Sequence, residues 1–419
     1  MKILIINKSD STGGAAIAAR RLKDALQANG HEVKMLVQEK LSDDDTIFST
    51  GTGKLKKYQN FLLFILERLY FLFYEKSKAL RFSFSPAIAG ENISNHPLVL
   101  EADVIHLHWF NQGFLSLKNL NQLLKLNKKT VWTLHDMWAF TGGCHYSGDC
   151  SNYTENCGNC KFLKHPAKND LSARILKQKR KIIKKKNIEI VTCSHWLAEK
   201  ARESDLLKGF TITAIPNAIN TTIFCPKDKS TLRTQLNLPI DKKLILFGSA
   251  NIMDERKGLR YLVSAIKRLK QENPALAENS EILLFGKSDD SFIEELVLKV
   301  NNLGIIKGES LISDIYAAAD VFVLPSLEDN LPNTIMESLS CGTPTVAFNS
   351  GGIPEMIDHQ KNGYLAEYKS VEELSKGIEY VLVQNDDKMN KLARGKVIEY
   401  YNQKRVAENY TSTYLNKRI

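Results

Sequence analysis

Short apolar runs alternate with helical patterns along the whole chain, and this alternation constrains the fold more than any other feature. In the first half, the segments that predict strands are residues 3–6, 32–37, 104–108, 130–134 and 188–193. A segment rich in small residues, 15–27, predicts a helix between the first two of these strands. Strands that are separated by helices pair in parallel, with helices covering both faces of the sheet. We therefore predict an α/β fold with a doubly wound parallel sheet.

The same pattern starts again after residues 215–220, a segment of turn-forming residues. In the second half, apolar runs predict strands at 243–247, 281–285, near 305–306, at 321–324 and at 345–348. A chain of 419 residues is long for a single core, so two domains are expected. We predict two Rossmann-like doubly wound domains facing across a cleft, residues 1–218 and 219–395, followed by a helical tail, residues 396–419. Ligands of such sheets bind beyond the carboxyl ends of the strands.

The loop after the predicted strand 321–324 has a composition suited to binding an anion. A polar segment follows that strand, and a short helix is predicted from 334 to 340, ending before Gly342. The start of this helix offers backbone N–H groups and a positive dipole to an anion. Asp329 and Glu337 bracket the loop, so both carboxylates can converge on a ligand. Such a site suits a sugar nucleotide; an ordinary turn with solvated acids is the alternative interpretation.

This loop resembles the acidic signature of the retaining nucleotide-sugar glycosyltransferases of family 4, which have the GT-B fold. The family's usual pattern is Glu, seven residues, Glu. Here Asp329 occupies the first position by register, with Glu328 beside it as the alternative, and Glu337 occupies the second. The resemblance covers nearly the full length and is also carried by Lys257-Gly258 and by residues 351–355. The chain resembles in particular the glycosyltransferases of bacterial capsule, exopolysaccharide and O-antigen synthesis.

The resemblance implies a role for each part of the donor site. Glu337 would bind the ribose, Asp329 the sugar hydroxyls, and Lys257 with backbone amides the diphosphate, where positive charge stabilises the leaving group. The family places an Arg just after the glycine that corresponds to Gly248. Ser249 or Ala250 occupies that position here, and Arg256 is the candidate substitute. The predicted donor-binding residues are Gly13, Gly14, Ser249, Arg256, Lys257, Asn330, Leu331, Pro332, Asn333, Thr334 and Glu337. The tail 396–419 would cross back to the N-terminal domain.

Gly13 and Gly14 lie between the first strand and the first helix. Paired glycines allow close approach of the backbone to a ligand, and the helix start offers amides to a phosphate. The segment is not a G-x-G-x-x-G motif, and no acidic residue ends the second strand, so a nicotinamide cofactor is disfavoured. It resembles the glycine loop with which the family contacts donor and acceptor; a plain strand–helix turn is the alternative.

Histidines lie at two predicted strand ends of the N-terminal domain. His135 and Asp136 end the strand 130–134, and the family carries a histidine at the matching place, near the reacting sugar. A neutral imidazole there could bond a donor hydroxyl, so His135 joins Asp329 and Glu337 as a predicted catalytic residue. His106, His108 and Trp109 lie at another strand end, and with Asp136 they are the predicted acceptor side. A structural role is the alternative for each of these histidines.

Four of the seven cysteines fall within the loop 141–162: Cys144, Cys150, Cys157 and Cys160. Clusters of this kind in a reducing compartment bind metal more often than they form disulfides. Four thiolates suit a closed, tetrahedral, structural Zn²⁺ site, and His145 is a further candidate ligand. Redox-labile pairs or four unligated thiols are the alternatives. No pattern indicates a catalytic metal, so we predict no cofactor for catalysis.

The net charge is +10, and ten of the basic residues lie within 164–186. Such a segment favours phospholipid or polyphosphate partners, whereas no motif for nucleic acid accompanies it. Residues 61–74 (FLLFILERLYFLFY) are the longest apolar run, too short to span a bilayer, with basic residues on both sides. They predict either a helix lying in a membrane interface or a core helix of the first domain. For the basic segment, a solvated helix face and contact with lipid headgroups are the alternatives.

Together these features predict a retaining glycosyltransferase that moves a sugar, a hexose, from a nucleotide-diphosphate sugar to a glycan or lipid-linked oligosaccharide in surface polysaccharide synthesis. The resemblance implies front-face attack, in which the leaving phosphate oxygen takes the acceptor proton. The alternative is a catalytically inactive sugar-nucleotide-binding or membrane-docked subunit of a polysaccharide synthesis complex. The first residues read as a strand and not as a signal peptide, which predicts a cytoplasmic location, with the inner membrane face as the alternative.

Overall fold

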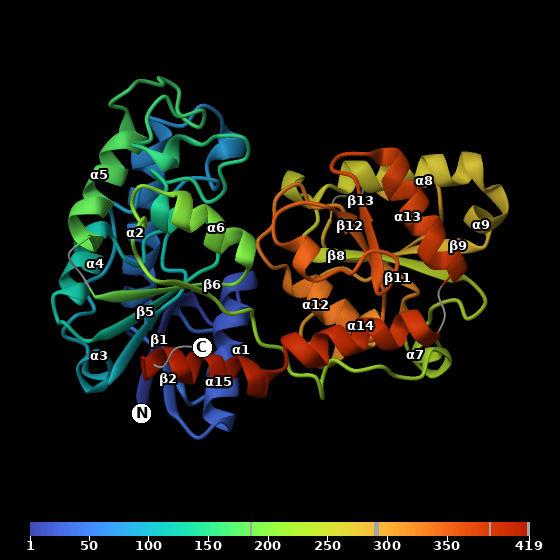
Figure 1. Ribbon diagram of the computed structural model, residues 1–419, viewed down its shortest axis with the longest axis horizontal. Helices are drawn as coiled ribbons and strands as arrows, with labels where there is room; N and C mark the ends of the chain where they lie inside the picture. The colour runs from blue at the N-terminus through green and yellow to red at the C-terminus, as the bar shows by residue number, and fades with distance from the viewer. Residues whose placement is uncertain (185–186, 289–292, 385–386, 417–419) are drawn as a thin grey trace. The chain divides into compact units, whose positions relative to one another are not determined.

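The computed structural model describes residues 1–184, 187–288, 293–384 and 387–416. Lys185 and Lys186 of the basic segment, and the last three residues of the predicted tail, lie outside the described residues. The chain divides into two compact units (Figure 1). Unit 1 is Met1–Pro216 together with the segment from Val406, and unit 2 is Asn217–Arg405.

Unit 1 is built on a parallel sheet of seven strands in the order β3-β2-β1-β4-β5-β6-β7. The order from β3 to β6 is that of a Rossmann fold. The strands are β1 Lys2–Ser9, β2 Glu32–Glu39, β3 Ile47–Ser49, β4 Val104–Leu107, β5 Lys129–Leu134, β6 Ile188–Thr192 and β7 Ile212–Ala214. The sequence predicted the five longer strands and missed the edge strands β3 and β7, because a run of three residues carries too little pattern.

Unit 2 repeats this topology with six strands in the order β10-β9-β8-β11-β12-β13. The strands are β8 Lys243–Asn251, β9 Ser280–Lys287, β10 Val300–Asn302, β11 Val321–Leu324, β12 Thr345–Phe348 and β13 Gly363–Ala366. The prediction of a strand near 305–306 is wrong: β10 ends at Asn302, before those residues. The predicted fold class, two parallel-sheet α/β domains, is confirmed.

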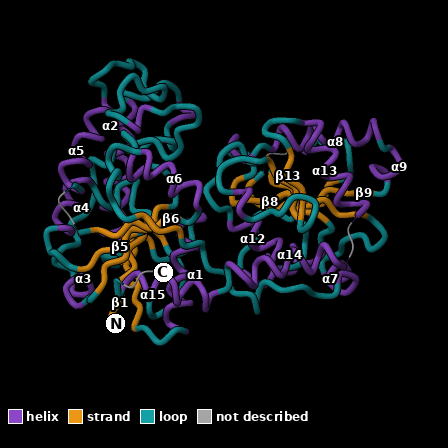
Figure 2. Tube along the Cα trace, in the orientation of Figure 1, coloured by secondary structure: helices purple, strands orange, loops and turns teal. Residues whose placement is uncertain are grey.

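Helices cover both faces of each sheet (Figure 2). In unit 1 they are α1 Gly14–Ala28, α2 Lys54–Leu72, α3 Pro97–Glu101, α4 Leu117–Leu124, α5 Leu171–Ile183 and α6 His195–Glu203. In unit 2 they are α7 Lys229–Gln235, α8 Leu259–Glu272, α9 Pro274–Glu278, α11 Glu309–Ala318, α12 Asn333–Ser340, α13 Val371–Gln384 and α14 Asp387–Tyr400. Ser194, predicted to cap α6, accepts a hydrogen bond from Leu197 N at 3.0 Å.

The C-terminal tail consists of two helices where the sequence predicted one. α14 lies within unit 2, and α15 (Gln403–Tyr414) carries the chain back to unit 1 from Val406, later than the predicted position 396. Tyr414 Oη lies 2.8 Å from His106 Nδ1, and Tyr410 Oη lies 3.0 Å from Thr133 Oγ1. The last helix therefore completes the core of unit 1 at the strands β4 and β5.

Candidate active site

Three loops of unit 2 meet at the carboxyl ends of the adjacent strands β8, β11 and β12. The loop after β11 donates from Leu327 N to Arg256 O at 2.7 Å, which joins it to the loop after β8. The loop after β12 donates from Gly352 N to Asp329 O at 3.0 Å. This edge of a doubly wound sheet is where ligands bind. The backbone bonds fix the predicted donor-binding segments to one another.

Lys257 and Asp329 form an ion pair at the centre of these loops. Their side-chain atoms Nζ and Oδ2 lie 2.6 Å apart, and the two side chains are 19% and 12% exposed. Lys257 ends a short 3₁₀ turn, Glu255–Lys257, and Gly258 follows it with a φ of +73°. A Cβ on Gly258 would lie 1.9 Å from Pro325 O, so only glycine lets the turn approach the end of β11 this closely. A predicted donor-binding residue, Lys257, and a predicted catalytic residue, Asp329, are thus in contact.

The helix α12 begins beside this pair at Asn333, one position before the predicted 334. Its N-cap is Pro332, which supplies no side-chain hydrogen bond, so the first turn presents backbone amides without a cap. Thr334 Oγ1 is buried and has no hydrogen-bond partner among the described residues. Glu337 follows one turn later and is 7% exposed. The helix start has the features of an anion site.

Asn217 holds the loop that precedes α12, a role that no sequence motif indicated. Its Nδ2 donates to Asn333 Oδ1 at 3.0 Å and approaches Leu331 O at 3.4 Å. Asn330 and Leu331 are buried. Asn217 lies in the segment that was interpreted only as a crossing between domains, because a contact across more than a hundred positions leaves no local pattern.

Ser249 and Arg256 are placed differently from the prediction. Ser249 was expected in a loop after the strand, but β8 continues to Asn251 with an irregular register against β9 from Gly248. Ser249 Oγ is buried with no hydrogen-bond partner among the described residues. Arg256 is 41% exposed and its Nη2 lies 2.7 Å from Asp254 Oδ2. The guanidinium therefore pairs with an acid of its own turn.

Gly13 and Gly14 begin the first helix of unit 1 as predicted. Gly13 caps α1 with a φ of +89°, and no side chain caps the helix. Asp10, in the same loop, accepts hydrogen bonds from Leu41 N at 3.0 Å and Ser42 Oγ at 2.6 Å. Burial raises the pKa of Asp10, but the bonds from Ser42 and Leu41 outweigh burial and lower it below its usual value. The acid thus fixes the shape of the glycine loop.

The three predicted histidines of unit 1 lie together, with His106 and His108 buried and His135 partly exposed. His108 Nδ1 and His135 Nε2 lie 2.8 Å apart. Burial lowers the pKa of His106 to about 3 and that of His135 to about 4, and lowers the pKa of His108 well below its usual value. All three rings are therefore neutral near pH 7.

His106 does not fit the predicted acceptor side. It is fully buried, and its Nε2 and Nδ1 bond to Thr133 Oγ1 and Tyr414 Oη, each at 2.8 Å. A ring with both nitrogens engaged inside the protein has none left for an acceptor. His108 differs, because its Nε2 is buried without a partner among the described residues, as is Asn111 Nδ2. Both line a small pocket together with His135 and Trp109. Asn111 was not singled out from the sequence.

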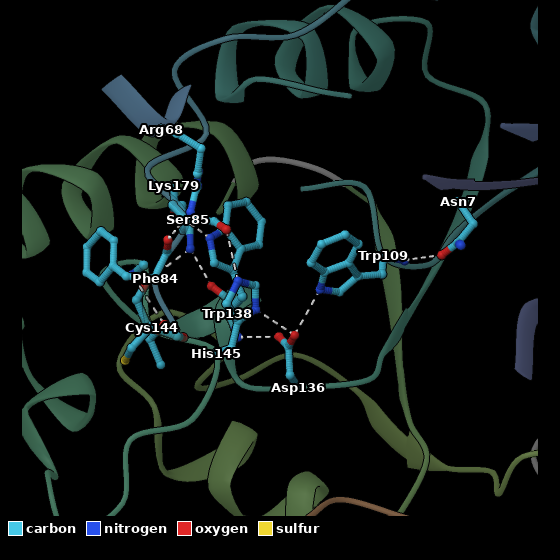
Figure 3. A network of polar contacts seen from close by, with 12 residues as sticks. Asn7, Arg68, Phe84, Ser85, Trp109, Asp136, Trp138, Cys144, His145 and Lys179 are labelled. Atoms are coloured by element: carbon cyan, nitrogen blue, oxygen red, sulfur yellow. Dashed lines mark hydrogen bonds and ion pairs between the residues drawn. The ribbon is translucent and has the colours of Figure 1, made fainter. Parts of the chain in front are cut away.

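Asp136 is the centre of a polar network shown in Figure 3. Its Oδ2 accepts from Trp109 Nε1 at 3.0 Å and from His145 Nδ1 at 2.7 Å. Burial raises the pKa of Asp136, but His145 together with the hydrogen bonds from Trp138 N and Trp109 lowers it below its usual value. His145 Nε2 lies 2.9 Å from Ser85 Oγ, which completes a Ser-His-Asp order. Ser85 is fully buried, so no substrate reaches its hydroxyl and the network orients Trp109 instead.

The cysteine loop contains four free thiols that line one pocket: Cys144, Cys150, Cys157 and Cys160. Burial raises the pKa of Cys157 and of Cys160 to about 11. Within the part of the chain that the structure describes, no group of three or more His, Cys, Asp or Glu residues is placed so that it could hold a metal ion. His145 uses both ring nitrogens on Asp136 and Ser85, which excludes it as a ligand in this arrangement. Zinc stays a prediction.

Two parallel-sheet α/β units of this topology are the architecture of the GT-B glycosyltransferases. Residues 12–223 match the family described as Glycosyltransferase Family 4, and residues 241–384 match Glycosyl transferases group 1. The chain belongs to Glycosyltransferase Family 4.

Several known proteins are similar to this chain. An uncharacterized glycosyltransferase of Methanocaldococcus jannaschii is 24% identical over 88% of this chain and 85% of its own length. WcaC of Escherichia coli (strain K12), named for colanic acid biosynthesis, is 26% identical over 64% of this chain and 63% of its own length.

Solved structures share the fold. Sucrose-phosphate synthase of Thermosynechococcus elongatus superposes with a TM-score of 0.70 at 20% identity, covering 99% of this chain and 98% of that one. HepE of Anabaena, solved in complex with UDP, has a TM-score of 0.64 at 16% identity, covering 99% of this chain and all of that one.

Proposed function

We propose that this glycosyltransferase is a retaining enzyme that moves a hexose from a nucleotide-diphosphate sugar to a hydroxyl of a glycan or lipid-linked oligosaccharide in surface polysaccharide synthesis. The observation that carries the proposal is the Lys257–Asp329 pair beside the uncapped start of α12. HepE has been solved with UDP-glucose, WaaG is described as acting in lipopolysaccharide biosynthesis, and WcaC is named for colanic acid. These relatives support the donor class and the pathway class.

In this proposal, the residues of unit 2 bind the donor. Lys257 and the amides of the first turn of α12 hold the diphosphate, with Thr334 Oγ1 as a further donor. Glu337 accepts hydrogen bonds from the ribose, and Asp329, released from Lys257 by the diphosphate, accepts them from the sugar. Lys257 would exchange its ion pair with Asp329 for one with the diphosphate, so its positive charge stays paired with a negative one throughout binding.

The transfer step breaks the bond between the anomeric carbon and the phosphate oxygen, and the nucleoside diphosphate leaves with the electron pair. The acceptor oxygen attacks the same face of the sugar, and its proton passes to the leaving phosphate oxygen. Lys257 and the helix amides stabilise the charge that develops on the diphosphate. His135, the predicted catalytic residue of unit 1, would act as a neutral ring, because its lowered pKa keeps it from becoming a cation. In this structure its Nε2 lies 2.8 Å from His108 Nδ1 and its Nδ1 lies 3.5 Å from Cys193 Sγ, so a bond to the sugar would have to replace one of these contacts.

A transfer assay with the matched variants Glu337→Gln and Glu367→Gln tests the proposal. Thermal-shift screening against UDP-, GDP- and ADP-sugars first identifies the donor. We expect Glu337→Gln to lose most transfer activity, while Glu367→Gln, at an exposed position of the same unit, retains it. Equal background rates in the wild type and both variants would instead indicate the inactive sugar-nucleotide-binding subunit.

We also propose that Cys144, Cys150, Cys157 and Cys160 hold a structural Zn²⁺, which would draw together four thiols that line one pocket but do not form a metal-binding group in the arrangement described here. Support comes from the four thiols lining one pocket in a loop with little core of its own. Elemental analysis of the purified chain should find about one zinc per molecule, absent from Cys157→Ser/Cys160→Ser and present in Cys225→Ser. A folded, metal-free wild type would contradict this.

A further inference from the structure

The helix α2 buries a face that contains charged residues and exposes its apolar face, the reverse of an ordinary surface helix. The residues that it buries against unit 1 are Glu67, Arg68 and Phe71. The opposite side carries large apolar residues at helical spacing, all exposed: Leu55 87%, Tyr58 61%, Leu62 40%, Leu66 53%, Leu69 50% and, just after the helix, Phe73 78%. Surface helices normally bury such a stripe. Contiguous exposed apolar surface of this kind marks an interaction site.

Specific bonds hold the charged face of α2 inward. Glu67 Oε2 accepts from Gly113 N at 3.0 Å, and Glu67 Oε1 lies 3.0 Å from Arg68 Nη2. Arg68 Nη1 donates to Arg81 O at 2.6 Å and to Phe84 O at 3.2 Å. Rotating the leucines inward would break these bonds and leave buried charges without partners, which is costly. The exposed stripe is therefore a fixed feature of the fold.

The exposed charges on residues 54–88 are positive, while Lys56 of α2 forms an ion pair with the half-buried Glu91. Between residues 54 and 88 the acids are Glu67 and Glu75, and both are buried. Lys54 and Lys57 are exposed at the start of α2, and Lys76 and Lys78 are exposed beyond its end. The apolar face is thus bordered by cations at both ends, without an exposed acid.

A second basic face continues from the end of α2. Arg174 of α5 lies over the ring of Tyr74, with its guanidinium carbon 5.9 Å from the ring centroid. From Arg174, exposed lysines follow along α5 at helical spacing: Lys177, Lys181 and Lys184. Figure 1 shows both helices in the same part of unit 1. The contact between Arg174 and Tyr74 joins the start of this basic face to the segment that follows α2.

We propose that unit 1 docks on an anionic lipid bilayer, with the apolar stripe of α2 in the membrane interface and the basic face of α5 at the headgroups. An apolar helix face bordered by lysines is the pattern of interfacial helices, and anionic headgroups attract each basic residue near the surface. No helix within the described ranges is long and apolar enough to cross a membrane. The docking does not depend on the transfer reaction proposed above.

A second copy of the chain fits this surface less well. Two α2 helices packed side by side, parallel or antiparallel, would bring lysine-bearing ends together. With no exposed acid along α2 to neutralise them, these like charges would repel. Anionic lipid supplies the missing charge along the whole stripe.

Vesicle co-sedimentation of the full chain tests the proposal, with phosphatidylcholine vesicles that contain or lack phosphatidylglycerol. The stripe variant is Leu62→Ser/Leu66→Ser/Leu69→Ser, and the matched control is Leu41→Ser/Leu100→Ser, at leucines exposed elsewhere in unit 1 (67% and 52%). We expect the wild type and the control to sediment with phosphatidylglycerol vesicles and the stripe variant to bind about tenfold more weakly. Circular dichroism should show all three folded, because every substituted leucine is exposed.

Lys177→Glu/Lys181→Glu tests the contribution of α5, and we expect it to weaken binding to phosphatidylglycerol vesicles and to reduce its salt dependence. Unchanged binding by this variant would overturn the part assigned to α5. A wild type that sediments with neither vesicle, or a stripe variant that binds as well as the wild type, would overturn the proposal. So would a wild-type dimer that the stripe substitutions convert to a monomer without any vesicle binding.

Discussion

Two sheets of the same topology carry polar residues at the same edge, yet the residues are used differently. At the strand ends of unit 1, the polar side-chain atoms of His106 and Asp136 are hydrogen-bonded to other groups of the protein. At the strand ends of unit 2, Lys257 and Asp329 form an ion pair with each other, and the buried hydroxyls of Ser249 and Thr334 have no hydrogen-bond partner in the described part of the chain. Topology decides where polar residues gather. Whether they are available to a ligand depends on what else reaches them.

The largest effect is expected from Lys257→Ala in unit 2. Removing the cation takes away the group that we assign to the diphosphate, so transfer should fall about hundredfold. The matched variant Lys267→Ala, at an exposed position on α8, should transfer like the wild type. Initial rates with the donor found by screening measure this. A Lys257→Ala enzyme with unaltered rates would break the comparison, because the available pair would then have no function.

A smaller effect is expected from the histidines of unit 1 when the pH is lowered. The folded-state pKa values of His106 and His135, about 3 and about 4, lie below the usual 6.5, so below that pH the unfolded chain binds protons that the folded chain excludes. Stability should therefore fall as the pH drops, by about 1 kcal/mol per pH unit for each of these histidines between about pH 6.5 and about pH 4.5.

Urea unfolding at several pH values, followed by tryptophan fluorescence, measures this effect in unit 1, because all four tryptophans lie there. The variant His106→Gln should flatten the dependence of the unfolding free energy on pH. His165→Gln, at an exposed position of the same unit, should leave it as in the wild type. A wild type equally stable across this range would show that the histidines are not kept neutral by the fold.

The smallest effect is expected from Tyr414→Phe in α15. This change leaves His106 Nδ1 buried without its hydrogen bond, which should lower the free energy of unfolding by about 1 kcal/mol. Tyr58→Phe, at a side chain 61% exposed, is the control and should have no effect. Equal stability of both variants would mean that the hydrogen bond from Tyr414 of α15 to His106 contributes nothing to the free energy of unfolding.

Local patterns were enough to predict the two strands that frame the unit 2 site. Residues 321–324 and 345–348 are β11 and β12 as predicted, because each is a continuous apolar run bounded by turn residues. Sequence motifs also identified Lys257 after β8, Asp329 after β11 and Glu337 on α12.

The rest depends on contacts between distant residues. His106 and Tyr414 lie 308 positions apart, so no sequence pattern shows that both nitrogens of the His106 ring are hydrogen-bonded. Glu67 and Arg68 are the two charged residues of the apolar run 61–74, yet with Phe71 they form the buried face of α2, because their partners lie on segments that follow the helix. Residues 61–74 were predicted to form either a helix in a membrane interface or a core helix. The helix packs on unit 1 through a narrow face with two charged residues, and its apolar side is exposed.

Titration calorimetry of nucleoside diphosphates is the most direct test of the claim that the Lys257–Asp329 site of unit 2 binds the donor. UDP, GDP and ADP would be titrated into the wild type, Lys257→Ala and Lys267→Ala. We predict that the wild type and Lys267→Ala bind one of the three with the same affinity, and that Lys257→Ala binds it about tenfold or more weakly. Equal affinity of Lys257→Ala and the wild type would contradict the account.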